Sequence, residues 1–327
     1  MSVELDMTFH SMGSDIRLLI GAPLLASAPA PWLAAEREEA FVEDFARRLS
    51  RFRADSELSL LNEDPRARVP ASPLLRASVR AAVWAASRSD GIVDPTLVGA
   101  IEKAGYTSSL DGASPASLSD ALAGAPARRP ARANPEELWR RISVDDQEGV
   151  VERPPGLRID SGGTGKGLCA DAVAHRLAGY SRYVVDCGGD LAIGGVGAQL
   201  EPYHVEIEHP LSGEAIRTVE IAAGGVASSG LNIRLWQDSE GRFSHHLLDP
   251  STGEPAWTGL IGATALAPSA LEAETLAKTA LLLGPGGAVR VLEEHGGLVV
   301  HDSGDVQIVG PLEASRGALS LVGASPR

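Results

Sequence analysis

A glycine-rich loop around a single lysine is the strongest chemical signal in this chain of 327 residues. Residues 160–167 read Asp-Ser-Gly-Gly-Thr-Gly-Lys-Gly, and Asp171 follows four residues later. Glycine allows a backbone to approach a ligand closely, and a lysine beside such a loop suits an anion, most often a phosphate. The segment therefore predicts a glycine turn that leads into a helix N-terminus and binds an anion.

The spacing of this loop is neither that of a Walker A motif nor that of a Gly-x-Gly-x-x-Gly dinucleotide-binding turn. A plain tight turn with a surface lysine is the alternative, because glycine loops are common. Other segments are needed to decide between the two.

Three other segments carry groups that could act on a bound anion. Residues 186–190 read Asp-Cys-Gly-Gly-Asp and suggest a second backbone turn at the same ligand, although a tight hairpin is the alternative. Residues 226–230 combine small hydroxyl side chains with glycine. His246 lies three residues before an Asp-Pro-Ser-Thr-Gly turn, and a histidine is a natural general base. A purely structural hydrogen bond is the alternative role for this histidine.

Glu274 and Lys278 are four residues apart in a predicted helix, so their side chains are neighbours on one helical face. An ordinary surface ion pair is the simplest interpretation of that spacing.

The composition excludes several classes of protein. The formal net charge of −14 argues against binding to nucleic acid and to an anionic membrane surface. No apolar run approaches the ~20 residues needed to span a bilayer, and the N-terminus has no basic segment followed by an apolar one. We therefore expect a cytoplasmic protein. Cys169 and Cys187 form no CxxC pair, so we expect two small buried side chains rather than a zinc or redox site.

Apolar periodicity predicts an α+β protein, and the length of the chain allows one large domain or two smaller ones. Strands come in runs with helices between them, which favours α+β over a doubly wound sheet. Residues 107–135 are rich in Ala, Pro, Ser and Arg, and we expect a helical excursion or a mobile, variable insertion there. On the predicted strand 243–248, His246 and Leu248 share a face. The predicted helices are 32–49, 74–87, 168–179 and 271–283, and the predicted strands are 3–20 with a break at 11–14, 142–144, 150–152, 158–159, 182–186, 203–208, 216–221, 225–228, 243–248, 297–301 and 306–309.

Taken together and in this order, the segments resemble the FAD:protein FMN transferase family, the ApbE-like flavin transferases. The resemblance extends from about residue 9 to residue 284. Each motif alone is modest, but their common order argues against a chance match. The matching segments are Ser11–Ser14, Ser50–Asn62, Gly91–Thr96, Asp160–Asp171, Asp186–Asp190, Ser228–Gly230 and His246–Gly253.

The resemblance implies a single domain over residues 1–327, with a T-fold-like α+β core of antiparallel sheets and packed helices that binds FAD. It implies a reaction that splits the FAD diphosphate with a bound divalent metal, usually magnesium, moves FMN to a threonine hydroxyl of an acceptor flavoprotein and releases AMP. His246 would take the proton from the acceptor hydroxyl, and Lys166 would neutralise the diphosphate. The flavin pocket and the diphosphate loops would include Met12, Asn62, Asp94, Thr96, Asp160, Gly162, Gly163, Gly188, Gly189, Ser229 and Gly230.

One position departs from the family pattern. The family's metal is usually held by an aspartate, a threonine four residues later and a backbone carbonyl of the glycine–lysine loop, here Gly165. In this chain the acid is Glu274, which could still bind magnesium, but the second position is Lys278, whose charged ammonium has no lone pair. We hypothesise that Lys278, paired with Glu274, takes the place of the cation and supplies a point charge near the diphosphate. The alternatives are a protein that binds flavin without transferring it and an FAD pyrophosphatase that yields FMN and AMP.

Overall fold

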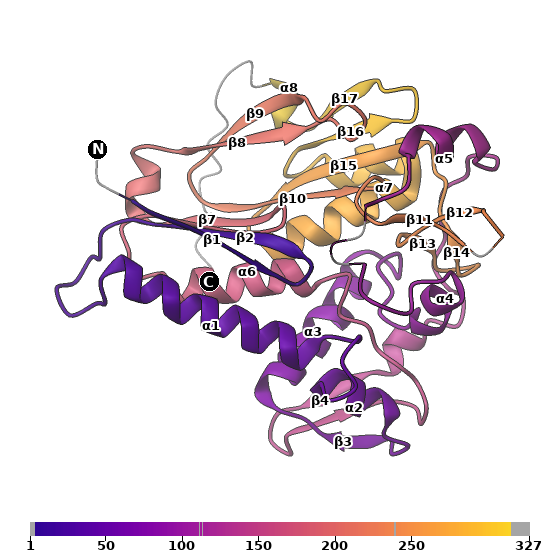
Figure 1. Ribbon diagram of the computed structural model, residues 1–327, viewed down its shortest axis with the longest axis horizontal. Helices are drawn as coiled ribbons and strands as arrows, with labels where there is room; N and C mark the ends of the chain where they lie inside the picture. Colours follow the sequence, from indigo (N-terminus) through magenta and orange to yellow (C-terminus); the bar gives the residue numbers. More distant parts are fainter. Residues whose placement is uncertain (1–3, 111, 113, 239, 315–327) are drawn as a thin grey trace.

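An eight-stranded antiparallel sheet forms the centre of the protein (Figure 1). The computed structural model describes residues 4–110, 112, 114–238 and 240–314. The strand order is β1-β2-β6-β7-β10-β15-β16-β17, and every neighbouring pair is antiparallel. The predicted α+β class is therefore confirmed. The strands are β1 (Leu5–Ser11), β2 (Ser14–Ile20), β6 (Tyr183–Cys187), β7 (Asp190–Gly194), β10 (Gly224–Gly230), β15 (Leu260–Ala267), β16 (Gly297–His301) and β17 (Val306–Val309).

Helices pack against one face of this sheet. The two helices α6 and α7 lie side by side against the central strands, and α1 lies along the edge formed by β1 and β2. The long helix α7 kinks at Gly284, whose φ is 69°, directly before Pro285, because proline cannot donate the backbone hydrogen bond that a straight helix requires. The helices are α1 (Pro31–Leu49), α2 (Glu57–Glu63), α3 (Pro73–Arg88), α4 (Val98–Lys103), α5 (Leu118–Gly124), α6 (Gly165–Arg176), α7 (Ala270–Leu292) and α8 (Pro311–Ala314), with short 3₁₀ helices at Leu138–Arg141 and Val196–Gln199.

The sheet is covered on both faces at its centre. Every residue of β15 is buried, because α7 packs on one face while the β8–β9 hairpin lies over the other. Ile207 of β8 and Ile221 of β9 belong to the same hydrophobic cluster as Leu266 of β15. A second cluster joins α1, α3 and α6 to β2 and β6. The smaller strands are β3 (Arg68–Pro70), β4 (Ser143–Asp145), β5 (Val150–Glu152), β8 (Tyr203–Glu208), β9 (Ala215–Ile221), β11 (Leu235–Gln237), β12 (Phe243–His245), β13 (Leu248–Asp249) and β14 (Glu254–Pro255).

Most predicted elements are present, with shifted ends. The break predicted at residues 11–14 is the β1–β2 turn, where Met12 and Gly13 both have positive φ. The predicted helix 168–179 starts earlier, at Gly165, and the predicted helix 271–283 continues beyond its kink to Leu292.

Other predictions about the elements are wrong. Residues 158–159 do not form a strand. The predicted strand 243–248 is interrupted, because β12 ends at His245 and β13 begins at Leu248. His246 therefore sits in the connection between two strands and does not share a strand face with Leu248. The sequence interpretation also missed β7 and β15.

The region 107–135 is tied to the rest of the molecule wherever the structure describes it. It contains α5, and residues 111 and 113 lie outside the described part. Ala116 N–H donates to the Leu235 carbonyl, and Ala131 N–H donates to the Leu282 carbonyl. The described part of this region thus contains one short helix, α5, and the expectation of a variable insertion stays a prediction.

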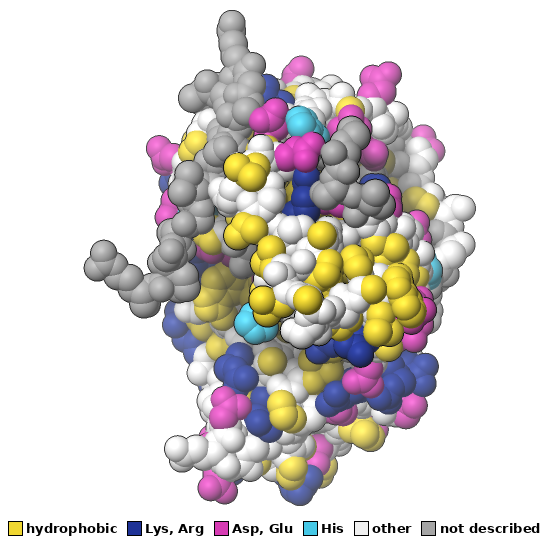
Figure 2. Space-filling model, turned by 90° about the vertical axis from the view of Figure 1, so that its left-hand side faces the viewer, with side chains coloured by type: hydrophobic (Ala, Val, Ile, Leu, Met, Phe, Trp, Pro, Cys, Tyr) yellow, Lys and Arg dark blue, Asp and Glu magenta, His cyan; other side chains and the backbone are white. Residues whose placement is uncertain are grey.

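Two loops at one end of the sheet, 22–30 and 195–201, expose large hydrophobic side chains. They lie close together, since Leu24 N–H donates to the Gly179 carbonyl and Gly197 N–H donates to the nearby Ser181 carbonyl. Hydrophobic side chains gather on the face of the molecule seen in Figure 2. Within the described residues, no helix combines the length and the apolar character needed to cross a membrane. The exposed side chains of the two loops are Leu24, Leu25, Val196 and Leu200.

Candidate active site

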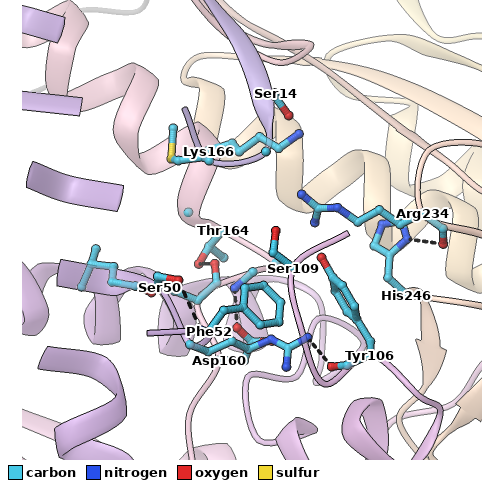
Figure 3. Close-up of a pocket in the computed structure, with 18 of the residues that line it drawn as sticks. Ser14, Ser50, Phe52, Tyr106, Ser109, Asp160, Thr164, Lys166, Arg234 and His246 are labelled. Atoms are coloured by element: carbon cyan, nitrogen blue, oxygen red, sulfur yellow. Dashed lines mark hydrogen bonds and ion pairs between the residues drawn. The ribbon is translucent and has the colours of Figure 1, made fainter. Parts of the chain in front are cut away.

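A cavity of about 1000 Å³ opens where several segments that are distant in the chain meet (Figure 3). The β1–β2 turn and the end of α1 form part of its wall. The glycine loop 160–166 contributes a second part, and the turn 92–97 lies next to it, held by the bond from Asp160 N–H to the Pro95 carbonyl. Residues 233–234 and 246–248 and the helix α7 complete the wall. The volume is suited to a ligand the size of a dinucleotide.

The glycine loop ends at the N-terminus of α6. Asp160 Oδ1 accepts a hydrogen bond of 2.9 Å from Gly162 N–H, which tightens the turn. Thr164 then precedes α6 without capping it through its side chain. The first turn of a helix carries backbone N–H groups that lack intrahelical partners, and these groups favour an anion.

Lys166 connects this loop to the β6–β7 turn. Its Nζ donates to the Gly188 carbonyl at 3.2 Å and lies 3.9 Å from Asp190 Oδ2. Gly188 and Gly189 have positive φ values of 65° and 92°, and a Cβ on Gly188 would lie 2.4 Å from Ser14 Cβ. Only glycine at position 188 therefore allows the two turns to pack together and hold the lysine beside the cavity.

A buried acid–base cluster lies behind Lys166. Glu274 is 1% exposed; its Oε2 accepts from Gly167 N–H at 2.9 Å, and its Oε1 accepts from Lys278 Nζ at 2.7 Å. Burial, together with the nearby Glu274 carboxylate, raises the pKa of Asp190 to about 7, while Lys166 and Lys278 oppose the shift. Two lysines thus share one small volume with two acids, and Lys278 also reaches the cavity wall.

His246 borders the cavity on the opposite side. Its Nδ1 lies 3.4 Å from the Arg234 carbonyl oxygen (Figure 3). Because a carbonyl can only accept, Nδ1 must carry the proton in this contact, and Nε2 keeps its lone pair. Burial, together with the charges of Arg234 and Lys278, lowers the pKa of His246 well below its usual value. The ring is therefore neutral at pH 7 and able to accept a proton.

An arginine and several aromatic rings form another wall of the cavity. The Arg51 guanidinium carbon lies 4.2 Å from the centre of the Phe52 ring and 4.6 Å from that of Tyr106. Arg51 is fixed by Asp160 at 3.4 Å and by the Tyr106 carbonyl at 2.9 Å. Phe52 is 37% exposed and lines the cavity. Such a surface can stack against a planar heteroaromatic ring.

The structure brings together some of the residues predicted for the site and leaves others outside the cavity lining. Asn62 binds both the N–H and the carbonyl of Ile159, each at 2.8 Å, and so fixes the segment that leads into the glycine loop. Thr96 donates to Asp94 Oδ1 at 2.7 Å. The predicted residues that line the cavity are Met12, Asp94, Asp160, Gly162, Gly163, Gly165, Lys166, His246 and Lys278, and those that do not are Asn62, Thr96, Gly188, Gly189, Ser229, Gly230 and Glu274.

Ser229 and Gly230 lie in β10, where they pair with Ala263 and Gly262 of β15. Ser229 is 8% exposed, and a Cβ on Gly230 would lie 2.5 Å from Asn232 Oδ1. Their places in the sheet explain their small size without a ligand.

Asp94 carries an unsatisfied atom in the cavity wall. Its Oδ1 accepts from the backbone and the hydroxyl of Thr96, whereas its Oδ2 is buried with no hydrogen-bond partner among the described residues. Burial raises the pKa of this carboxyl. A ligand that donates a hydrogen bond would satisfy the free oxygen.

Residues 12–300 match the model of the ApbE family. The chain belongs to the ApbE family. It is 30% identical over 255 residues to the FAD:protein FMN transferase of Klebsiella pneumoniae, covering 76% of this chain and 71% of that protein. It is 33% identical over 159 residues to the FAD:protein FMN transferase of Escherichia coli K12, and the match covers 47% of this chain and 45% of that protein. The fold matches the apo crystal structure of Pseudomonas stutzeri flavinyl transferase ApbE with a TM-score of 0.75 and 23% sequence identity. The match covers 99% of this chain and 98% of that chain.

The described residues of this ApbE-family protein do not fit the metal site that the resemblance implies. Among them, no group of three or more His, Cys, Asp or Glu side chains could hold an ion. Both oxygens of Glu274 are engaged, one by Gly167 N–H and one by the Lys278 ammonium. Magnesium prefers an octahedral set of oxygen ligands, and the ammonium stands where such an ion would meet the carboxylate. The assignment of a metal to Glu274 and Gly165 is thus not supported by the donor set.

Sequence reasoning did not select Arg51, Phe52, Tyr106 or Arg234. Two of them lie within the Ser50–Asn62 segment, where an arginine beside an aromatic residue could have been noticed. Tyr106 and Arg234 lie outside the motifs, and only the fold brings them to the cavity.

Proposed function

We propose that this protein is an FAD:protein FMN transferase: it splits the diphosphate of FAD, transfers FMN to a Thr or Ser hydroxyl of an acceptor protein and releases AMP. The names of the Klebsiella and Escherichia relatives support this reaction. The observation that carries it is the position of His246, whose Nδ1 lies 3.4 Å from the Arg234 carbonyl oxygen, in the same cavity as the Lys166 glycine loop.

His246 acts as the general base. The acceptor hydroxyl enters the cavity, gives its proton to Nε2 and attacks the phosphorus of the FMN half. The new bond joins the hydroxyl oxygen to that phosphorus, and the bond to the bridging diphosphate oxygen breaks. AMP leaves with the electron pair of that bond, and the proton on His246 passes to AMP or to water. A base whose pKa lies below the working pH is unprotonated when the substrate arrives.

Lys166 and Lys278 stabilise the leaving group. Negative charge accumulates on the AMP phosphate as the bond breaks, and fixed cations in a partly buried site stabilise that charge more than water does. Lys278 is held by Glu274 at 2.7 Å, so its ammonium is positioned before the substrate binds. We propose that it replaces the divalent ion of the metal-dependent reaction, acting as a point charge.

The metal question has a direct test. Magnesium is titrated calorimetrically into the FAD complex after EDTA treatment. We expect no tight uptake by the wild type, and transfer activity that persists in EDTA. The variant Lys278→Thr should gain magnesium binding, because it frees Glu274 and adds a hydroxyl oxygen. Tight uptake by the wild type would eliminate the lysine-for-metal proposal while leaving the transferase assignment intact.

The reaction itself is tested by product analysis. The protein is incubated with FAD and an acceptor protein, and covalent FMN and free AMP are measured. Equal amounts of both are expected. Free FMN with AMP would identify an FAD pyrophosphatase, and unchanged FAD would indicate a protein that binds flavin only.

Variants separate binding from chemistry. His246→Asn should retain FAD affinity and lose transfer, because the amide cannot accept and carry a proton. His204→Asn is the matched control, since this exposed side chain pairs with Glu220 on the β8–β9 hairpin. The cytoplasmic location stays a prediction.

A further inference from the structure

Arg234 places a cation in the cavity that the reaction outlined above does not yet use. It lies directly before β11 and lines the cavity, where its guanidinium points into the open space (Figure 3). Its side chain is partly buried. Its backbone carbonyl is the acceptor that orients His246.

Arg234 differs from other cations of the cavity wall in having no acid beside it. Lys278 pairs with Glu274 at 2.7 Å, and Arg51 lies 3.4 Å from Asp160. Among the described residues, no carboxylate lies within 4.0 Å of the Arg234 guanidinium, and no hydrogen bond of that group is found. A partly buried charge without a counter-charge is costly, and a phosphate that accepts two parallel hydrogen bonds is the preferred partner of a guanidinium.

The position of Arg234 relative to His246 indicates which phosphate it meets. Strands β11 and β12 pair Leu235 with His245, so Arg234 and His246 stand opposite each other at the end of the same hairpin. A phosphate held by Arg234 is therefore next to the general base. In the proposed reaction, the phosphate next to the base is the one that the acceptor hydroxyl attacks.

We propose that Arg234 binds the FMN phosphate of FAD and selects for flavins that carry a 5′-phosphate. This inference rests on the proposed function, and it divides the diphosphate between two sets of cations. Arg234 holds the phosphate that is transferred, while Lys166 and Lys278 face the phosphate that leaves with AMP.

The test compares the affinities of four ligands for the wild type and for Arg234→Gln: riboflavin, FMN, FAD and AMP. Flavin binding is followed by fluorescence and AMP binding by calorimetry. Loss of a charge-assisted contact should weaken the binding of FMN and FAD on the order of ten- to hundred-fold. The affinities for riboflavin and AMP should change by less than about two-fold. Arg234→Lys keeps the charge without the paired donors and should recover part of the FMN affinity.

Arg242→Gln is the matched control, because Arg242 lies in the same β11–β12 hairpin but outside the cavity lining, where its guanidinium pairs with Asp238 at 2.8 Å. It should leave FMN affinity unchanged. An equal loss for riboflavin and FMN in Arg234→Gln, a loss confined to AMP, or no loss at all would overturn the role given to Arg234. If the wild type binds none of the four ligands, the proposed function itself fails, which is a separate result.

Discussion

Replacing Lys278 with methionine tests whether the buried ion pair between Lys278 and Glu274 stabilises the folded protein. Lys278 Nζ lies 2.7 Å from Glu274 Oε1, with side-chain exposures of 12% and 1%. In the variant, the buried carboxylate keeps only the Gly167 N–H donor. Removing one partner of a buried ion pair costs about 3–5 kcal/mol. Because the lysine end is slightly exposed, we expect a loss near the lower value, about 3 kcal/mol.

The loss can be measured by urea unfolding, followed by the fluorescence of the five tryptophans. Lys103→Met is the control, since Lys103 pairs with Glu254 at 3.7 Å in a solvent-exposed position. It should cost less than about 0.5 kcal/mol.

A second substitution completes a double-mutant cycle. Glu274→Gln removes the charge, while its amide oxygen can still accept from Gly167 N–H. Combined with Lys278→Met, it should restore much of the lost stability and give a coupling energy of about 2 kcal/mol. A loss below about 1 kcal/mol, with no coupling, would refute the reasoning. Glu274 would then be hydrated or protonated in the native protein, and Lys278 would have no fixed place from which to replace a metal ion.

Three further substitutions test other parts of the site. The pKa of Asp190 is raised to about 7, so its contribution to stability is present below its unfolded pKa near 4 and is lost as the pH rises through about 7. Asp190→Asn should therefore flatten the pH dependence of the urea midpoint over this range. Parallel curves of urea midpoint against pH for the wild type and the variant would contradict this. Gly167→Ala should lower the melting temperature, because a Cβ there would lie 2.7 Å from the Ala270 carbonyl oxygen, whereas Gly179→Ala, with no atom within 4 Å, should not. Phe52→Ala should weaken FAD binding in a fluorescence titration with little change in melting temperature, because the ring is 37% exposed in the cavity wall; unchanged affinity would mean that the ring does not contact the ligand.

The sequence by itself determined the features that depend on neighbouring residues. Apolar spacing is a local property, so α1 and α3 were predicted within one or two residues of their ends. Glycine is favoured where the backbone adopts a positive φ or closely approaches another segment. This preference identified the turns at Gly13 and Gly188. The motifs also identified His246, Lys166 and Lys278, all of which line the cavity.

Only the tertiary structure decided which of these residues share a site. The strand β15 is buried on both faces, so it has no alternation of polar and apolar residues to reveal it. Asn62 was expected in the flavin pocket, but its side chain instead forms hydrogen bonds with the backbone of Ile159 and fixes the segment that leads into the glycine loop. Arg234 belongs to no motif and reaches the cavity because β11 pairs with β12 beside His246. Such contacts join residues far apart in the chain, and local spacing carries no information about them.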